Sequence, residues 1–146
     1  MTRVINLTPG PTELDQVWGL RHDYYKLFMQ DYGKSIGRVD PVLVELCRLR
    51  VAQLVESQFD LALRYAPAVR AGLDEQKIAD LPRYPTAEGF TERERVCLEF
   101  TEQFVISSSA ISDQDVARAS SAFRLAPPAV APPTMPEFLL PAQAAA

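Results

Sequence analysis

Apolar side chains between Asp40 and Leu54 recur at three- and four-residue steps, which is the spacing of one face of an α-helix. Asp40 stands before Pro41, and this pair is typical of a helix start. An acidic N-cap accepts backbone N–H groups, and proline at the first helical position sacrifices no hydrogen bond. The face contains Leu43, Leu46, Cys47, Arg50 and Leu54 and is widened by Val42 and Val51. The pattern predicts a half-buried helix that begins after Asp40.

A second helix start follows at Ser57, where the serine and an acid three residues later, Asp60, resemble a capping box. Apolar residues then continue toward Gly72, and glycine is the preferred residue directly after the last turn of a helix. We therefore expect a second helix, consecutive with the first, from Ser57 to Gly72.

Capping residues also mark the starts of the other expected helices, at Thr12, Asp74, Thr91 and Ser112. The helix after Thr12 is unusually aromatic and is expected to end at Tyr32–Gly33. In the last two helices the apolar positions expected to face inward are Val96, Cys97, Phe100, Phe104, Val105, Val116, Ala119 and Phe123. Because no stretch alternates long enough between apolar and polar residues to favour a sheet, the predicted class is all-α.

The character of the chain changes at Ala126. Prolines interrupt an alanine-rich stretch up to Ala146, and such a sequence cannot propagate a helix. We expect one helical domain over residues 1–125 and a disordered tail over 126–146. The alternative for the tail is a polyproline segment that crosses a groove through Phe138, Leu139 and Leu140.

Composition narrows the classes of function. Hydrophobic residues make up 47% of the chain, the net charge is −4 and the pI is about 5.0. The negative net charge and the low pI argue against a nucleic-acid partner, because a nucleic-acid-binding protein would require a basic stripe. No apolar run is long enough for a bilayer, and Met1–Asn6 lacks a signal-peptide core, so a cytoplasmic protein without a membrane partner is expected. No spacing favours a metal site or a phosphate-binding loop, so neither metal nor cofactor is expected.

Three segments together are similar to the carboxymuconolactone decarboxylase and alkylhydroperoxidase D-like family: residues 45–54 (ELCRLRVAQL), 57–64 (SQFDLALR) and 71–73 (AGL). The resemblance extends over residues 90–123 and implies an alkylhydroperoxidase D-like helical bundle and a homo-oligomer. The peroxidase branch of that family has a Glu, a Cys-x-x-Cys and a His. Here Glu45 matches the Glu, Ser57 and Asp60 stand at the two Cys positions, and Arg64 stands at the His position. The last helix of the family is replaced by the tail.

The absence of the Cys-x-x-Cys excludes dithiol peroxidase chemistry at this motif, because a serine hydroxyl and a carboxylate cannot form a disulfide. Capping can explain the substitutions, with Ser57 as N-cap and Asp60 and Arg64 as an i,i+4 pair. In the functional interpretation, Glu45, Ser57, Asp60 and Arg64 line one pocket, with a carboxylate as general base and Arg64 holding a small carboxylate ligand.

The family resemblance leaves alternative functions open. The first is thiol-independent proton transfer on a small organic acid or lactone. The second is a non-catalytic oligomeric binding or structural module. The third is alkylhydroperoxidase or peroxiredoxin-type antioxidant activity, which requires Cys47 or Cys97, although both lie on apolar faces and are expected to be buried thiols. Convergence of Glu45, Asp60 and Arg64 on one cavity would favour the enzyme.

Overall fold

The computed structural model describes residues 22–123 and the pair 138–139. The expected helix start at Thr12 and most of the expected tail lie outside these residues. Within them the secondary structure is predominantly helical, which confirms the all-α class. None of the helices in this part of the chain combines the length and the hydropathy that a bilayer crossing requires.

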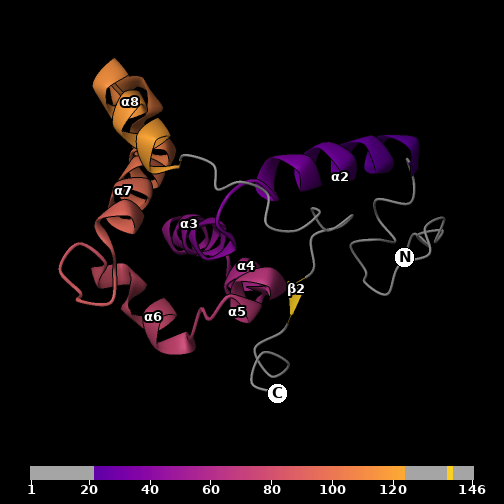
Figure 1. The fold of residues 1–146 in the computed structure, drawn as a ribbon, viewed down its shortest axis with the longest axis horizontal. Helices are drawn as coiled ribbons and strands as arrows, with labels where there is room; N and C mark the ends of the chain where they lie inside the picture. Colours follow the sequence, from indigo (N-terminus) through magenta and orange to yellow (C-terminus); the bar gives the residue numbers. More distant parts are fainter. Residues whose placement is uncertain (1–21, 124–137, 140–146) are drawn as a thin grey trace.

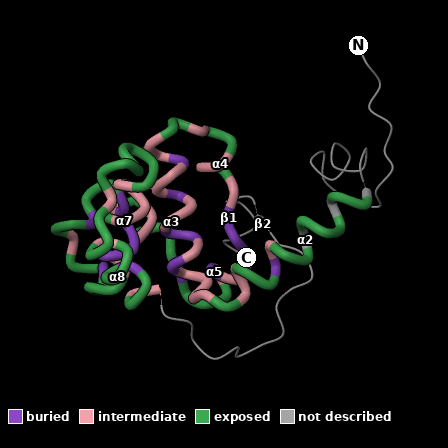
Figure 2. Tube along the Cα trace, turned by 90° about the horizontal axis from the view of Figure 1, so that it is seen from above, coloured by how far each residue is buried: buried purple, intermediate pink, exposed green. Residues whose placement is uncertain are grey.

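Helix α3 (Pro41–Leu54) lies at the centre of the molecule, as Figure 1 shows. Its first turn begins as the sequence predicts, because an Asp40 carboxylate oxygen accepts the N–H of Val42 at 2.9 Å. The buried face of α3 consists of Leu43, Glu45, Leu46, Leu49 and Ala52. This face packs against α7 (Glu92–Ser107) and α5 (Ala66–Arg70), and the burial follows α3 in Figure 2.

The hydrophobic core gathers around α3 from segments on both sides of it. Leu46 and Leu49 from α3 meet Tyr65 and Ala68 from the segment before Gly72. The segment between α5 and α7 and the first half of α7 complete the cluster with Leu73, Leu81, Tyr84, Phe90 and Leu98. The aromatic rings of Tyr84 and Phe90 meet edge to face with centroids 6.4 Å apart, a favoured geometry for buried rings.

Helix α2 (His22–Ile36) extends away from this core as an arm (Figure 1). The predicted end at Tyr32–Gly33 is wrong, because the helix runs through Gly33 to Ile36 and the Gly33 carbonyl accepts the Gly37 N–H at 3.0 Å. Ile36 packs against the core cluster. This packing opposes the propensity cost of a glycine inside a helix, which is roughly 1 kcal/mol.

The end of α3 is a Schellman motif built around a non-glycine residue. The Ser57 N–H donates to the Ala52 carbonyl at 2.9 Å, and the Glu56 N–H donates to the Gln53 carbonyl at 3.3 Å. Glu56 occupies the left-handed position with φ of 55°. The same motif closes α5, where Gly72 has φ of 95° and the Leu73 N–H reaches the Ala68 carbonyl. The predicted C-terminal cap at Gly72 is therefore confirmed.

The predicted single helix from Ser57 to Gly72 is wrong. It is divided into α4 (Gln58–Ala62), the short strand β1 (Arg64–Tyr65) and α5. Pro67 explains the interruption, because a helix through this point would need a Pro67 N–H to bond the Leu63 carbonyl and would bring the proline ring against that carbonyl. Instead, Leu63 is extended with ψ of 153° and Pro67 lies in the first turn of α5.

The remaining helix starts are confirmed. Asp74 caps α6 (Glu75–Asp80), which is followed by the 3₁₀ turn η2 (Leu81–Arg83). Thr91 caps α7 with a full capping box, and Ser112 does the same for α8 (Asp113–Ala122) after the 3₁₀ turn η3 (Ser108–Ala110). At each of these capped helix starts the side-chain oxygen accepts a backbone N–H of the first turn.

The second half of α7 and all of α8 form another arm, opposite α2 (Figure 1). Val96, Cys97 and Leu98, near the start of α7, are buried. The inward positions predicted further on are wrong for Phe104, Val105 and Val116, which are 61%, 38% and 47% exposed. Within α7 only the beginning supplies buried side chains. The apolar pattern of α7 therefore extends beyond the turns of the helix that pack against the core. Ala119 is buried, as predicted.

A two-residue ladder joins distant parts of the chain. Strand β1 pairs antiparallel with β2 (Phe138–Leu139), which lies in the segment for which disorder was expected. Arg64 stands opposite Leu139, and Tyr65 stands opposite Phe138. Both residues of β1 are buried, and Figure 2 shows β1 beside α5.

Candidate functional site

Glu45 lies on the buried face of α3 and is 0% exposed. Burying an unpaired carboxylate is costly, so its hydrogen-bond partners decide what it can do. Oε1 accepts the Tyr65 N–H at 2.9 Å and an Arg48 Nη2–H at 2.8 Å. Oε2 accepts the Arg48 Nε–H at 2.6 Å. Both oxygens are therefore engaged by donors of the protein itself.

Arg48, one turn along α3 from Glu45, forms a bidentate pair with that carboxylate. Its remaining contacts go to backbone carbonyls at the end of α4. Nη1 donates to the Asp60 carbonyl at 2.8 Å, and Nη2 donates to the Leu63 carbonyl at 2.9 Å. A helix terminates in carbonyls without intrahelical partners, and a cation favours that end of the helix dipole. Arg48 thus ties α3 to the end of α4.

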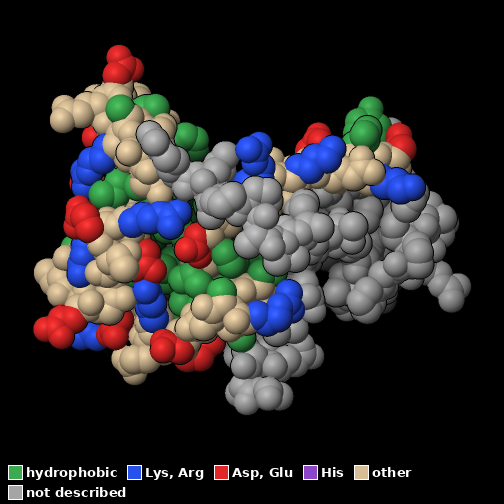
Figure 3. Space-filling model, viewed as in Figure 1, with side chains coloured by type: hydrophobic (Ala, Val, Ile, Leu, Met, Phe, Trp, Pro, Cys, Tyr) green, Lys and Arg blue, Asp and Glu red, His purple; other side chains and the backbone are tan. Residues whose placement is uncertain are grey.

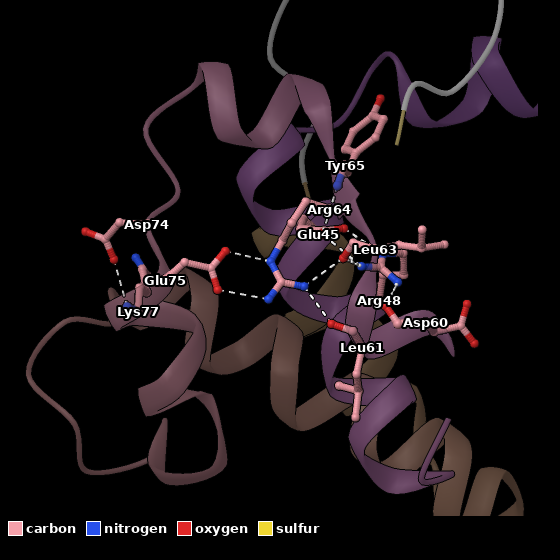
Figure 4. Close-up of polar contacts among 10 residues, drawn as sticks. All are labelled: Glu45, Arg48, Asp60, Leu61, Leu63, Arg64, Tyr65, Asp74, Glu75 and Lys77. Atoms are coloured by element: carbon pink, nitrogen blue, oxygen red, sulfur yellow. Dashed lines mark hydrogen bonds and ion pairs between the residues drawn. The ribbon is translucent and has the colours of Figure 1, made fainter. Parts of the chain in front are cut away.

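Ser57 and Asp60 form the local cap that one interpretation of the sequence predicts. The Ser57 Oγ accepts the Asp60 N–H at 3.3 Å and lies 2.5 Å from the Asp60 Oδ2, to which its hydroxyl donates. The Asp60 carboxylate points away from both arginines in Figure 4. Ser57 and Asp60 therefore support the start of α4.

Arg64 is 7% exposed and pairs with Glu75 of α6 rather than with Asp60. Its Nε and Nη2 donate to the two Glu75 oxygens at 2.7 and 2.9 Å. Its Nη1 donates to the carbonyls of Leu61 and Leu63 at 2.7 and 2.8 Å. The i,i+4 pair with Asp60 is wrong because α4 ends at Ala62, before Arg64 can lie on the same helix face.

Arg48 and Arg64 share one acceptor, the Leu63 carbonyl, and approach it from opposite sides (Figure 4). This carbonyl is the group that Pro67 leaves without a helical N–H partner. The proline break and the arginine pair are thus two parts of one arrangement. Glu45 faces Arg48, Asp60 faces Ser57 and Arg64 faces Glu75, so the four predicted pocket residues lie within one region but do not face a common ligand.

Sequence reasoning missed Tyr32, Tyr65 and Glu75 as members of this region. Burial is the main cause that raises the pKa of the Tyr32 and Tyr65 hydroxyls, and the Glu45 carboxylate adds to both shifts. The hydrogen bond from Arg64 lowers the pKa of Glu75. The pairing of Arg48 with Glu45 could have been predicted, because Arg48 stands three residues after Glu45 on one helix. The pairing of Glu75 with Arg64 could not, because Glu75 belongs to a different element from Arg64.

The two thiols lie on α3 and α7, which pack against each other, and both are free; Cys97 is buried and Cys47 is partly buried. Burial raises the pKa of Cys47 to about 11, and burial together with the neighbouring Cys47 raises the pKa of Cys97 to about 12. The nucleophilic form of cysteine is the thiolate, so neither residue has the low pKa that peroxide chemistry requires. Their expected role in the core agrees with this environment.

The hydrogen bonds that the Glu45 carboxylate already accepts restrict the chemistry that this region can perform. A general base needs a lone pair within reach of a substrate proton, whereas both Glu45 oxygens already accept charged or backbone donors. Among the described residues no group of three or more His, Cys, Asp and Glu side chains has the geometry of a metal site.

Comparison of the chain with protein-family models, with curated protein sequences and with solved structures finds no match.

Proposed function

We propose that this protein is a non-catalytic helical module that associates with itself. We further propose that it is a carboxymuconolactone decarboxylase-like chain in which the residues at the family's Glu, Cys and His positions have a structural role. The observation that carries the proposal is the enclosure of Glu45. Its carboxylate is fully buried and receives three donors from Arg48 and Tyr65, so it supports the fold where a catalytic base would need access to a ligand.

The replacement residues support the same interpretation. Ser57 and Asp60 cap α4, and Arg64 fixes α6 through Glu75. Each of these contacts stabilises local structure without a ligand, by roughly 1 kcal/mol for a helix cap. A binding role remains at the surface, where a small organic molecule or a second copy can contact the protein without entering the Glu45 region.

Self-association is supported by apolar side chains on both arms. Tyr24, Leu27 and Phe28 on α2 are 59%, 62% and 49% exposed. At the end of α7, Phe104 and Ile106 are 61% and 70% exposed. Hydrophobic side chains are visible over both arms in Figure 3. Clusters of large exposed apolar side chains are typical of interaction sites.

The oligomeric half of the proposal is tested by light scattering at micromolar concentration on two matched variants. We expect the wild type to exceed the monomer mass and Ile106→Glu to reduce that mass. Phe59→Glu is the control, because Phe59 is equally exposed at 66% but lies on α4, away from both arms. A monomeric wild type, or equal dissociation by both variants, would contradict the proposed surface.

The catalytic half is tested by assaying the wild type for turnover of small lactones and carboxylated rings and for peroxide consumption with a dithiol reductant. We expect no turnover in either assay. Lactone or acid turnover that disappears in Glu45→Gln, while circular dichroism shows that the variant stays folded, would favour the proton-transfer enzyme. Peroxide turnover that disappears in Cys47→Ser or Cys97→Ser would favour the antioxidant activity.

A further inference from the structure

Strand β1 has two edges with different partners. On the inner edge the Tyr65 N–H donates to the Glu45 Oε1. On the outer edge β1 pairs with β2, with Arg64 opposite Leu139 and Tyr65 opposite Phe138. A strand edge presents N–H and C=O groups that require partners, and an added extended segment is one way to supply them. The outer edge is thus a position where extended chain joins the helical fold.

We propose that the outer edge of β1 is a strand-addition site whose resident ligand is the protein's own C-terminal segment around Phe138–Leu139. Strand addition obtains its affinity from main-chain hydrogen bonds, so such a site accepts an extended peptide. Within the described residues the ladder comprises two residue pairs, so the covalent connection contributes to keeping the segment in place. This inference is independent of whether Glu45 is catalytic.

The sequence of the connection suits a tether. Residues 124–137 link the end of α8 to β2 and include Pro127, Pro128, Pro132, Pro133 and Pro136. Proline lacks the N–H that helices and ladders need, so this stretch competes poorly for the edge. A chain of this length reaches about 50 Å at most. A connection of this length gives the attached segment an effective local concentration of about the millimolar range. At micromolar protein, each copy's own segment therefore occupies its site in preference to the segment of another copy.

The register identifies which backbone group of β2 matters. Consecutive residues of a strand direct their N–H and C=O groups to opposite edges. The Tyr65 N–H is directed inward to Glu45, so the Arg64 N–H and C=O are directed outward, toward Leu139. Leu139 therefore supplies the N–H that faces β1, whereas the N–H of Phe138 faces away. Leu139→Pro removes a ladder donor, and Phe138→Pro is its matched control.

Amide hydrogen exchange measured by NMR on the full-length chain tests the site. In Leu139→Pro the Arg64 amide should exchange at least tenfold faster than in the wild type, whereas Phe138→Pro should change it less. The Tyr65 amide, held by Glu45, should stay protected in both variants and reports that the fold is intact. A synthetic peptide of residues 134–144, added at millimolar concentration to Leu139→Pro, should restore the protection of Arg64. The same peptide N-methylated at Leu139 should not.

Two outcomes would overturn the inference. One is equal exchange of Arg64 in the wild type and in Leu139→Pro, or failure of the peptide to protect it. The other is exchange of the strand between molecules. To test this, isotope-labelled Leu139→Pro is mixed with unlabelled wild type at micromolar concentration. If the Arg64 amide of the labelled variant becomes protected, the occupant of the β1 edge is the segment of a second copy instead of that of the same chain.

Discussion

Burial makes Glu45 and Arg48 dependent on each other. Glu45 is fully buried, and Arg48 is 19% exposed, so neither charge can be well solvated if its partner is lost. A surface pair of the same sequence spacing contributes less than ~1 kcal/mol, and a broken buried pair costs several times as much. The local environment, rather than the spacing of the two residues, determines the energetic role of this pair.

We expect Glu45→Gln to lower the free energy of unfolding by about 3 kcal/mol, because the Arg48 charge is left uncompensated inside the protein. Urea denaturation measures the change. Glu99→Gln is the control, since it removes a carboxylate from the exposed pair with Arg118 and should cost less than ~1 kcal/mol.

A double-mutant cycle with Arg48→Met separates the pair from the individual residues. The double variant should lose clearly less stability than the sum of the two single variants. A loss below ~1 kcal/mol in Glu45→Gln would show that the Arg48 charge is well accommodated without its partner.

Glu75 makes a pH-dependent contribution, because the hydrogen bond from Arg64 lowers its pKa in the folded protein. A carboxylate with a lowered folded pKa stabilises the protein fully above its unfolded pKa. The contribution is lost as the pH falls through the folded value. We expect the stability difference between the wild type and Glu75→Gln to be largest near neutral pH and to shrink below pH 4.5, the ordinary pKa of the group.

Chemical denaturation at several pH values measures that difference. Glu88→Gln is a suitable reference, because Glu88 is an exposed acid in the loop before Phe90. A difference between the wild type and Glu75→Gln that stays constant from neutral to acidic pH would exclude the ion pair as the source of the stability.

At the scale of the elements, helix starts could be predicted from the sequence and one interruption could not. Asp40, Asp74, Thr91 and Ser112 each cap the helix expected of them. These signals are local, because the capping side chain bonds a backbone N–H two or three residues away. The break at Leu63 also has a local cause, Pro67, but apolar residues on both sides continue the helical pattern across it. Periodicity alone therefore predicted one helix where proline enforces two.

The two Schellman motifs allow opposite substitutions at their left-handed positions, Glu56→Gly and Gly72→Ala, to be compared. Glu56 occupies a left-handed conformation that costs a residue with a Cβ roughly 1–2 kcal/mol. Glycine removes this cost but loses more conformational freedom on folding, so Glu56→Gly should stabilise the protein by about 0.5–1 kcal/mol. Thermal and urea denaturation both measure the change.

Gly72→Ala is the counterpart and should destabilise by about 1 kcal/mol. A Cβ added at Gly72 meets nothing within 4 Å, so its effect isolates the backbone conformation from steric clashes. If Glu56→Gly were destabilising, an interaction of the Glu56 side chain would have to outweigh the strain.

At the scale of the whole molecule, a compact centre carries two arms. Periodicity predicted the helices of the arms but not their exposure, because a helical pattern does not state how far a partner element extends alongside it. Phe104 and Val116 are the clearest cases. The candidate site shows the same limit, since the partners of Glu45 and Arg64 include Tyr65 and Glu75, which folding brings together from separate elements.

The arms should also differ from the centre in local stability. Every side chain that the structure describes between Asp23 and Asp31 is exposed, whereas α3 is packed on several sides. Helices held by few packed contacts open at a low free energy. We expect the amides of this part of α2 to exchange rapidly at low protein concentration and to become protected as the concentration rises, with α3 protected throughout.

Hydrogen exchange followed by mass spectrometry at several protein concentrations measures this pattern. Val105→Lys, at the end of α7, serves to compare the two arms, because Val105 is exposed and lies away from α2. Concentration-independent exchange in α2 would remove this helix from the self-association surface and leave the α7 end as its remaining candidate.

The pairing of the buried Glu45 carboxylate with Arg48 has a consequence for how the two positions can change during evolution. A lineage that loses either residue first passes through a protein with an uncompensated internal charge, so single replacements at these positions should be selected against. Simultaneous exchange for an apolar pair of similar volume avoids that intermediate. A saturation library covering both positions should therefore yield folded members that change together. Positions 57 and 60, whose contribution is a helix cap, should tolerate single replacements, because the loss of a cap costs only about 1 kcal/mol.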